Sequence, residues 1–257
     1  MTVTDVNVVK SAIFERPDDA NKGTLGSLLC VCGSYGMAGA AVMSAKGALR
    51  TGIGLAKCAL PRSIYPIVAQ TILESVYYPL SENADGRISK VNVPFLVSES
   101  CKSSATLVGC GLGVCDDTLK IVFSLIENST TPLVLDADAL NCVAKQPEIL
   151  LRKKVPIIIT PHPGEMSRLT GLATPLVNAE RERVALDFAQ KYGVVTVLKG
   201  AGTVIASPNG KVLVNPTGNS GMATGGSGDV LAGMTASILA QGASAFSSAA
   251  AAVYLHG

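Results

Sequence analysis

Asn215-Pro-Thr-Gly-Asn-Ser-Gly-Met-Ala-Thr-Gly-Gly-Ser-Gly-Asp229-Val-Leu-Ala-Gly233 is a glycine-dense segment that runs through one carboxylate into an apolar, alanine-rich pattern. Glycines allow the backbone to approach a ligand closely. The apolar pattern that follows is typical of a helix, and the free N–H groups and dipole at a helix start favour negative charge. The segment therefore predicts an anion site at the entrance of a helix.

Asp229 is a carboxylate at a position where an anion is expected to bind. Its charge opposes a phosphate, so a chemical role explains it best: it can take a proton from a hydroxyl that attacks a phosphoryl group. The alternative is structural, because aspartate is also favoured at helix N-caps and in first turns. Spacing alone leaves both interpretations open.

Short apolar runs alternate with helical patterns along the rest of the chain, which is typical of a parallel sheet covered on both faces. A turn at Pro208-Asn-Gly210 then predicts an antiparallel hairpin from 203–207 and 211–214. We expect one α/β domain over residues 1–257, with a mostly parallel sheet and a small antiparallel extension. The predicted strands are 27–33, 53–59, 73–78, 105–109, 132–136, 156–160 and 194–199, and the predicted helices are 38–51, 116–128, 138–145 and 178–192.

Composition excludes several classes of function. The 257 residues carry a formal net charge of +2 with no Lys/Arg block, no Trp and 4% aromatic residues. Nucleic acids are bound by clustered basic patches and aromatic stacking platforms, so we expect no nucleic-acid partner. No uninterrupted membrane span occurs, and the N-terminal residues lack the pattern of a signal peptide. We therefore expect a cytoplasmic protein that does not bind membranes.

Cysteine and histidine usage narrows the chemistry further. The seven Cys residues fall mostly in apolar runs, which indicates small buried side chains in a reducing compartment. No Cys-x-x-Cys pair occurs, so the sequence predicts no metal–thiolate site. With only two His residues, His162 and His256, His-dependent triads and His-rich metal centres are disfavoured.

Polar or glycine-rich segments follow many of the predicted strands. In open α/β sheets, ligands bind beyond the C-terminal ends of the strands, so we expect these segments to converge with the Asp229 loop in one pocket. The segments are 33–39, 109–113, 136–141, 160–165 and 199–203.

Each of these segments also has a plain structural interpretation. The segments 33–39 and 109–113 could admit a pyrophosphate, but they lack the G-x-G-x-x-G fingerprint and a P-loop. Close packing of a strand and a helix is the more frequent explanation of a segment like 33–39, and a simple turn explains 109–113 equally well. Lys199 could reach phosphate oxygens, although a lysine at a strand end is usually a solvated charge. His162 and Glu165 share a helix entry, where Glu is a routine first-turn residue. A serine hydrolase is disfavoured, because G-x-S-x-G requires glycine where Asp229 stands.

Together, these segments resemble the ADP- or ATP-dependent NAD(P)H-hydrate dehydratases, carbohydrate-kinase-like repair enzymes of the ribokinase superfamily. The resemblance runs from about Lys22 to the last residue and implies a ribokinase-like three-layer sandwich. It is carried by Lys22-Gly-Thr-Leu-Gly26, Gly33-Ser-Tyr-Gly-Met-Ala-Gly-Ala-Ala41, Leu49-Arg-Thr-Gly-Ile-Gly-Leu55, Gly109-Cys-Gly-Leu-Gly113, Leu135-Asp-Ala-Asp-Ala-Leu-Asn141, Thr160-Pro-His-Pro-Gly-Glu165, Lys199-Gly-Ala-Gly-Thr203 and Asn219 to Gly233.

The resemblance also implies roles for individual residues. Asp229 would be the catalytic base, and Glu165 would help to order Mg²⁺, with His162 where the superfamily motif has Asn. The remaining implied sites are Ala40, Gly111, His162 and Asp229 for the hydrated dinucleotide; Lys199, Gly200, Ala201, Gly202, Thr203 and Gly228 for ADP or ATP; and Gly225, Gly226, Ser227 and Gly228 for the anion hole.

The activity implied by this resemblance is dehydration of the S form of NAD(P)H hydrate, with ADP as phosphoryl donor in a stand-alone homotetramer. Two alternatives stay open: an ATP-dependent vitamin-precursor or sugar kinase of the same superfamily, and a non-catalytic nucleotide sensor. Two departures from the family pattern stand out. Cys110 replaces a proline that many members carry, and the chain ends at Gly257, where relatives continue into a helical segment that we expect to be missing here.

Overall fold

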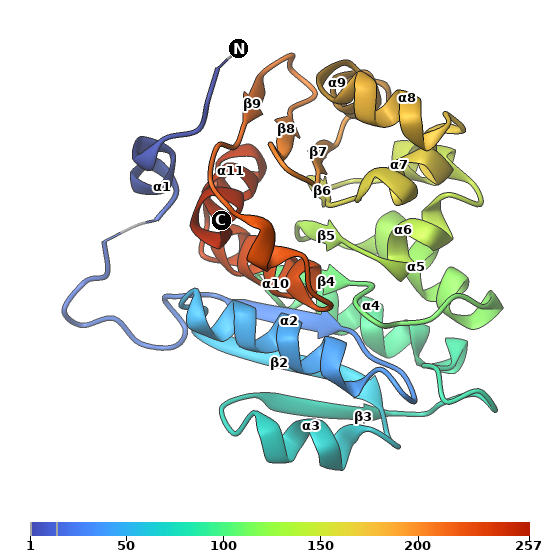
Figure 1. Cartoon of the computed structure of the whole chain (residues 1–257). Coiled ribbons are helices and arrows are strands. Elements are labelled where there is room, and N and C mark those ends of the chain that lie inside the picture. Colours follow the sequence, from blue (N-terminus) through green and yellow to red (C-terminus); the bar gives the residue numbers. More distant parts are fainter. Residues whose placement is uncertain (1, 14) are drawn as a thin grey trace.

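The computed structural model describes residues 2–13 and 15–257. Within them, nine strands form one sheet in the order β3-β2-β1-β4-β5-β6-β7-β8-β9 (Figure 1). Neighbouring strands from β3 to β7 pair in parallel, and β8 and β9 are added antiparallel. The expected parallel sheet with an antiparallel extension is therefore confirmed. The strands are β1 Ser27–Val31, β2 Leu55–Pro61, β3 Val76–Leu80, β4 Ala105–Val108, β5 Leu133–Leu135, β6 Ile157–Ile159, β7 Val195–Leu198, β8 Val204–Ala206 and β9 Val212–Val214.

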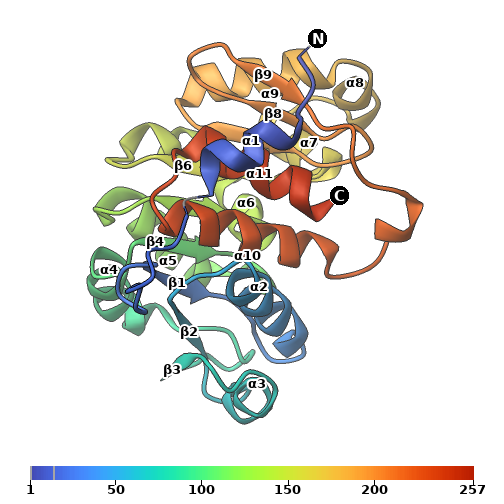
Figure 2. The same cartoon turned by 90° about the vertical axis from the view of Figure 1, so that its left-hand side faces the viewer.

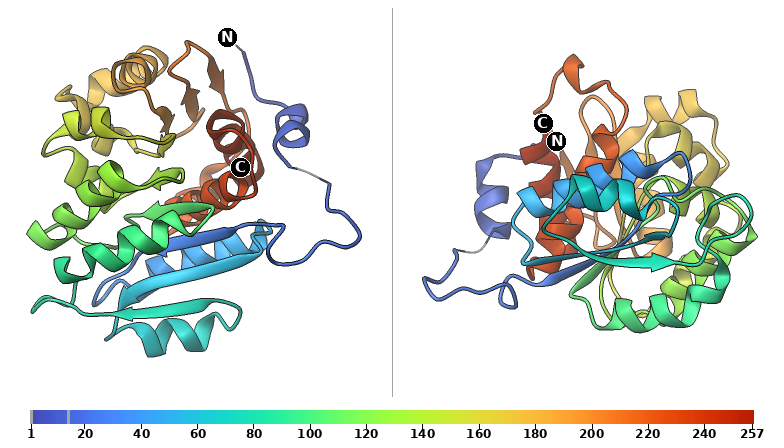
Figure 3. Two further views of the ribbon diagram at one scale, coloured as in Figure 1. Left: turned by 180° about the vertical axis from the view of Figure 1, so that it is seen from behind. Right: turned by 90° about the horizontal axis from the view of Figure 1, so that it is seen from below.

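Helices cover both faces of this sheet. Figure 2 shows one layer in front of the strands, and Figure 3 shows the other layer from behind and from below. The first layer contains α1 Val6–Ala12, α2 Ala38–Arg50, α3 Tyr65–Thr71, α10 Ser227–Ala240 and α11 Ala245–His256. The second contains α4 Val93–Cys101, α5 Asp116–Asn128, α6 Asp138–Val143, α7 Pro163–Thr170, α8 Thr174–Ala179 and α9 Arg181–Tyr192, and the short 3₁₀ helices are Lys90–Asn92, Pro147–Arg152 and Ser220–Met222.

Two hydrophobic cores lie on opposite faces of the sheet. Along β1, Leu28 and Cys30 face the α2 and α10 side, whereas Leu29 and Val31 face the α5 side. All four side chains are buried. A strand that is covered on both faces has no polar face, which is why these strands read as continuous apolar runs in the sequence.

Helix α10 packs very closely against α2, and glycine makes this possible. A Cβ on Gly233 would lie 2.0 Å from the carbonyl oxygen of Ser44, and a Cβ on Gly47 would lie 2.6 Å from that of Val230. Any larger residue would push the two helices apart. The close packing fixes α10 against the centre of the sheet, with the start of the helix at the edge where the parallel strands end.

Some element boundaries differ from the sequence prediction. The helix expected at 178–192 is two helices, because the backbone breaks at Glu180, where φ is −125° and ψ is 40°. Strands β2 and β3 begin two to three residues later than expected and continue through Pro61 and Pro79. Pro79 is tolerated because β3 is an edge strand, where a missing N–H costs no ladder bond. Among the residues described, no helix has both the length and the apolar character needed to cross a bilayer.

Candidate active site

The strand order reverses between β1 and β4, and the loops that follow these two strands meet. The backbone N–H of Gly33 donates to the carbonyl of Cys110 at 2.8 Å, and Ser34 Oγ donates to the carbonyl of Gly111 at 2.8 Å. A Cβ on Gly111 would lie 2.7 Å from that of Ala40, so the two predicted substrate residues are neighbours. Ligands of open α/β sheets bind at such reversal points.

Helix α10 begins at this edge with an open backbone. Its N-cap is Gly226, whose φ of +89° is in the left-handed region, and no side chain caps the helix. Within the described part of the chain, no hydrogen bond is recorded from the backbone N–H of Gly228 or Asp229. Gly225 to Gly228 therefore form a backbone cradle of the kind that can accept an anion, at the place where the sequence predicts an anion hole.

Asp229 lies in the first turn of α10 and faces other site residues. One carboxylate oxygen of Asp229, one of Asp136 and the Cys110 sulfur all lie within 4.8 Å of one another. Burial, followed by the nearby charge of Asp136, raises the pKa of Asp229 to about 6. Gly226, not Asp229, is the N-cap of α10, and Asp229 lies in the first turn, which is the other structural position considered from the sequence.

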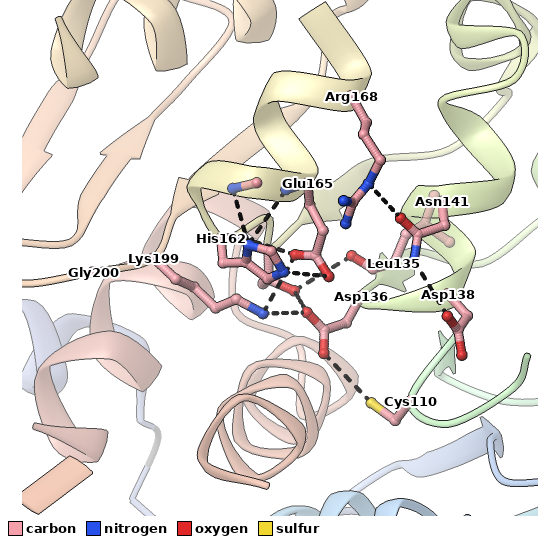
Figure 4. Close-up of polar contacts among 12 residues, drawn as sticks. Cys110, Leu135, Asp136, Asp138, Asn141, His162, Glu165, Arg168, Lys199 and Gly200 are labelled. Carbon is pink, nitrogen blue, oxygen red and sulfur yellow. Dashed lines mark hydrogen bonds and ion pairs between the residues drawn. The ribbon is translucent and has the colours of Figure 1, made fainter. Parts of the chain in front are cut away.

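Lys199 is held inside the site by Asp136. Its Nζ lies 2.7 Å from Asp136 Oδ1, with side-chain exposures of 17% and 2%, and Thr160 Oγ1 donates to the same oxygen at 2.7 Å (Figure 4). Burial lowers the pKa of Lys199, but the carboxylates of Asp136 and Glu165 outweigh it and raise the pKa overall. Lys199 Nζ is also 3.2 Å from a Cβ position on Gly228. The interpretation of Lys199 as a solvated surface charge is therefore wrong, because its ammonium group is mostly buried and lies against the start of α10.

His162 and Glu165 build the start of α7 together. The His162 Nδ1 accepts from the N–H groups of Gly164 and Glu165 at 3.0 and 3.3 Å, and Glu165 Oε2 accepts from the His162 N–H at 2.8 Å. This is a capping box, the structural role considered from the sequence. Glu165 also lies close to the Asp136–Lys199 pair, because its Oε2 is 3.9 Å from Lys199 Nζ. Burial raises the pKa of Glu165.

The turn from Lys199 to Thr203 joins β7 to β8. The Thr203 hydroxyl donates to the carbonyl of Gly200 at 2.9 Å and closes the turn, where Gly200 has a φ of +145°. Behind the turn, Arg181 Nη2 donates to the carbonyl of Leu198 at 2.8 Å. A cavity of about 550 Å³ borders Ala201 and Gly202. The turn is thus a defined backbone surface next to Lys199.

The sequence did not identify every residue in this cluster. Asp136 appeared only as the start of a polar segment after a strand, yet it joins Lys199, Thr160 and Cys110. His256 was given no role, but its Nε2 lies 3.5 Å from Ser227 Oγ, in the cradle. The sequence feature that could have identified Asp136 as a site residue is its position directly after a predicted strand. The position of His256 has no such signal, because it depends on how α11 packs beside α10.

An open α/β sheet with a glycine-lined helix start and a buried Lys–Asp pair at its C-terminal edge is the architecture of a ribokinase-like protein. The model of the family described as NAD(P)H-hydrate dehydratase matches residues 28–257. The chain belongs to this family.

Individual relatives agree with this assignment. A bifunctional NAD(P)H-hydrate repair enzyme of Moorella thermoacetica is 39% identical over 248 residues, which cover 96% of this chain and 47% of the relative. The chain thus spans about half the length of such bifunctional relatives. An ADP-dependent (S)-NAD(P)H-hydrate dehydratase of Neisseria meningitidis is 36% identical over 94% of this chain and 78% of its own length.

A solved structure supports the fold over the whole chain. The ADP/ATP-dependent NAD(P)H-hydrate dehydratase of Bacillus subtilis, co-crystallised with ATP and Mg²⁺, superposes with a TM-score of 0.85 at 31% identity. The match covers 100% of this chain and 87% of that chain. The ribokinase-like fold expected from the sequence is therefore confirmed.

Proposed function

We propose that this protein dehydrates the S form of NADH hydrate or NADPH hydrate and thereby restores NAD(P)H, with ADP as phosphoryl donor. Membership of the NAD(P)H-hydrate dehydratase family supports the substrate, and the name of the Neisseria relative supports ADP. The observation that carries the proposal is the position of Asp229, a half-buried carboxylate beside unpaired first-turn N–H groups.

Asp229 acts as the general base. A pKa of about 6 leaves most of the carboxylate ionised at neutral pH while keeping it basic enough to accept a proton, which is the range in which general bases work best. Base assistance of this kind is worth about 10²- to 10⁴-fold in rate. A helix-end charge effect is worth about 1 kcal/mol or less and would not require a buried carboxylate.

The reaction balances as follows. Asp229 takes the proton of the ring hydroxyl, the hydroxyl oxygen bonds to the terminal phosphorus of ADP, and the bond to the bridging oxygen breaks to release AMP. The carbon–oxygen bond of the phosphorylated ring then breaks and phosphate leaves, while the neighbouring ring carbon gives up a proton to solvent and the double bond is restored. The backbone N–H groups of Gly225 to Gly228 and the ammonium of Lys199 stabilise the charge that develops on the phosphate.

Each ligand is assigned its own part of the cleft. The hydrated dinucleotide contacts Ala40, Gly111, His162 and Asp229, and the close approach of Ala40 and Gly111 supports a shared surface for it. The adenine nucleotide contacts Lys199, Gly200, Ala201, Gly202, Thr203 and Gly228. Lys199 Nζ lies close to Gly228, which supports the proposal that both residues contact the phosphate groups of the same nucleotide.

Mg²⁺ is the proposed metal of the nucleotide complex. The donor chemistry fits, since Mg²⁺ prefers carboxylate oxygens and retains water ligands. Glu165 is the candidate ligand. Its Oε2 already accepts from the His162 N–H, so a water-mediated contact suits it better than direct ligation. When bound, the ion would neutralise phosphate charge during transfer.

We further propose a cytoplasmic homotetramer whose small-molecule partners are NAD(P)H hydrate and an adenine nucleotide. The family assignment supports these partners. Molar-mass measurement by light scattering after size-exclusion chromatography tests the oligomeric state directly, with a tetramer expected and a monomer contradicting it.

The decisive assay of the activity combines NADH hydrate with ADP and Mg²⁺. We expect the absorption of the reduced nicotinamide to return, with one AMP and one phosphate formed for each NADH. A stable phosphorylated product with ATP would instead indicate a kinase. Binding of nucleotide without any turnover would indicate a sensor, and either result would refute the dehydratase assignment.

A further inference from the structure

Three donor atoms from three different elements face one point in the candidate site. They are the sulfur of Cys110, after β4, and one carboxylate oxygen each of Asp136, after β5, and Asp229, in α10. All three lie within 4.8 Å of one another. Cys110 and Asp136 are almost completely buried, at 0% and 1% exposure, and Asp229 is half-buried.

The two oxygens of Asp136 serve different sides of the site. Oδ1 accepts from Thr160 and pairs with Lys199, whereas Oδ2 faces the Cys110 sulfur at 3.7 Å (Figure 4). Asp229 has no recorded ion pair with any described residue. The ammonium of Lys199 therefore stands among three carboxylates, those of Asp136, Glu165 and Asp229, and negative charge is left uncompensated in a poorly solvated place. A cation between Oδ2 and Asp229 would remove that repulsion.

The donor set selects the kind of cation. Mg²⁺ requires oxygen ligands in octahedral geometry, and a thiol is a poor partner for it. Two carboxylates and one thiolate suit Zn²⁺, which also accepts a solvent or substrate oxygen as a fourth ligand. We propose that Cys110, Asp136 and Asp229 form a binding site for Zn²⁺ or a similar thiophilic divalent cation.

This proposed site differs from the sequence prediction, which expects no metal–thiolate site. That prediction depended on the absence of paired cysteines, whereas the ligands here come together only through the sheet. In the free protein, a hydrogen bond that the Cys110 thiol donates to Cys32, together with burial, raises the pKa of Cys110, so its thiol stays protonated. A bound metal deprotonates such a thiol.

Occupation of this site would inhibit the enzyme. Asp229 cannot accept a proton while it binds Zn²⁺, so the cation removes the general base of the proposed reaction. This consequence depends on the proposed function, but metal binding itself does not. Inhibition by zinc would be a property of this chain rather than of relatives that lack a cysteine at the position of Cys110.

Cobalt provides a direct optical test of binding. We expect an anaerobic titration of the purified full chain with Co²⁺ alone to give a thiolate-to-cobalt absorption that saturates at one equivalent and is displaced by Zn²⁺. The band should disappear in Cys110→Ser and in Cys110→Ala. It should persist in Cys142→Ala, a matched control because Cys142 is equally buried but lies beside Thr118.

Two results would overturn the site. The first is the absence of the band in the wild-type protein, and the second is its survival without the Cys110 sulfur. Thermal unfolding of each variant establishes that it is folded. Because the titration needs no turnover, a missing band rejects the metal site and leaves the dehydratase proposal intact. A clear band in a protein without dehydratase activity supports the metal site and rejects the dehydratase proposal.

Inhibition gives a second readout within each variant. We expect Zn²⁺ to stop NADH-hydrate turnover and a chelator to restore it. The Zn²⁺ concentration for half inhibition should rise by about 100-fold or more in Cys110→Ser, since even outer-shell partners of metal ligands change affinity by about 10- to 100-fold. Equal sensitivity of Cys110→Ser and the wild type would contradict the assignment of Cys110 as a ligand.

Discussion

At the scale of single residues, the site depends on where buried charges are placed. Asp136 is buried and is paired with Lys199. Asp229, in the first turn of α10, has no such ion pair, and its pKa is raised above the ordinary value. The two carboxylates therefore have different environments, one that suits a structural anion and one that suits the proposed general base. The sequence identified Asp229 from the glycines around it. It could not identify the pairing of Asp136, because the two partners are 63 positions apart.

The raised pKa of Asp229 predicts how the reaction depends on pH. We expect kcat/KM to rise about tenfold per pH unit at acidic pH and to level off above about 6, since the ionised carboxylate is the active form and kcat/KM reports on the free enzyme. Initial rates at low substrate concentration check this. An acidic inflection near the ordinary value of 3.8 would contradict the raised pKa of Asp229.

The stability of the fold should fall as pH rises through the pKa of Asp229, whereas kcat/KM should rise. The folded pKa of about 6 exceeds the ordinary 3.8, so between these values the folded state binds more protons than the unfolded state. Ionisation of Asp229 therefore costs stability as pH rises through this window, and the cost persists above it. The ionised carboxylate, which is the form that the proposed reaction uses, therefore lowers the stability of the fold.

The Asp136–Lys199 pair predicts a large loss of stability when one partner is removed. Lys199→Met leaves a buried, unpaired carboxylate and should lower the free energy of unfolding by about 3 to 5 kcal/mol. Chemical denaturation measures this loss, and Lys199→Met combined with Asp136→Asn should recover part of it. Arg152→Met is the control, because Arg152 pairs with Glu127 at 63% and 33% exposure and should cost less than about 1 kcal/mol. Equal losses in both variants would show that burial of the pair has no special role.

At the scale of elements, the strands and the longest helices were predictable, whereas several short helices and some boundaries were not. The apolar runs placed every strand, and α2 and α5 were predicted almost to the residue. The seven-residue helix α3 was missed, because it is too short to show a 3.6-residue period. The break between α8 and α9 was missed for another reason: the polar residues around Glu180 suit a helix, and the chain bends there to cover the sheet.

The α2–α10 contact gives a prediction at this scale. Gly233→Ala places a methyl group 2.0 Å from the Ser44 carbonyl oxygen, so it should destabilise the protein by about 1 to 3 kcal/mol and displace the start of α10. Gly39→Ala is the matched control, because its Cβ would meet nothing closer than 4.0 Å and alanine favours helix by about 0.5 to 1 kcal/mol. Thermal unfolding measures the stability of both variants, and only Gly233→Ala should be less stable than the wild type. A tolerated Gly233→Ala would show that the helices can separate without cost.

At the scale of the whole molecule, the fold brings together residues that lie far apart in the chain. Ala40, Gly111, Lys199 and Asp229 come from four different segments, and all lie at the C-terminal edge of one sheet. Parallel pairing accounts for this, since it places every strand end and the loop after it on the same side. The location of the site was therefore predictable from the strand pattern. The contacts within it were not, because they depend on how α10 and α11 pack across the sheet.

The claim that Asp229 is the general base at the phosphate cradle is tested most directly by Asp229→Asn, with turnover of NADH hydrate and ADP affinity measured on the same preparation. We predict that kcat falls by about 10²- to 10⁴-fold. ADP affinity, measured by calorimetry, should change by less than about fivefold, the equivalent of about 1 kcal/mol. Turnover within a few-fold of the wild type would contradict the claim.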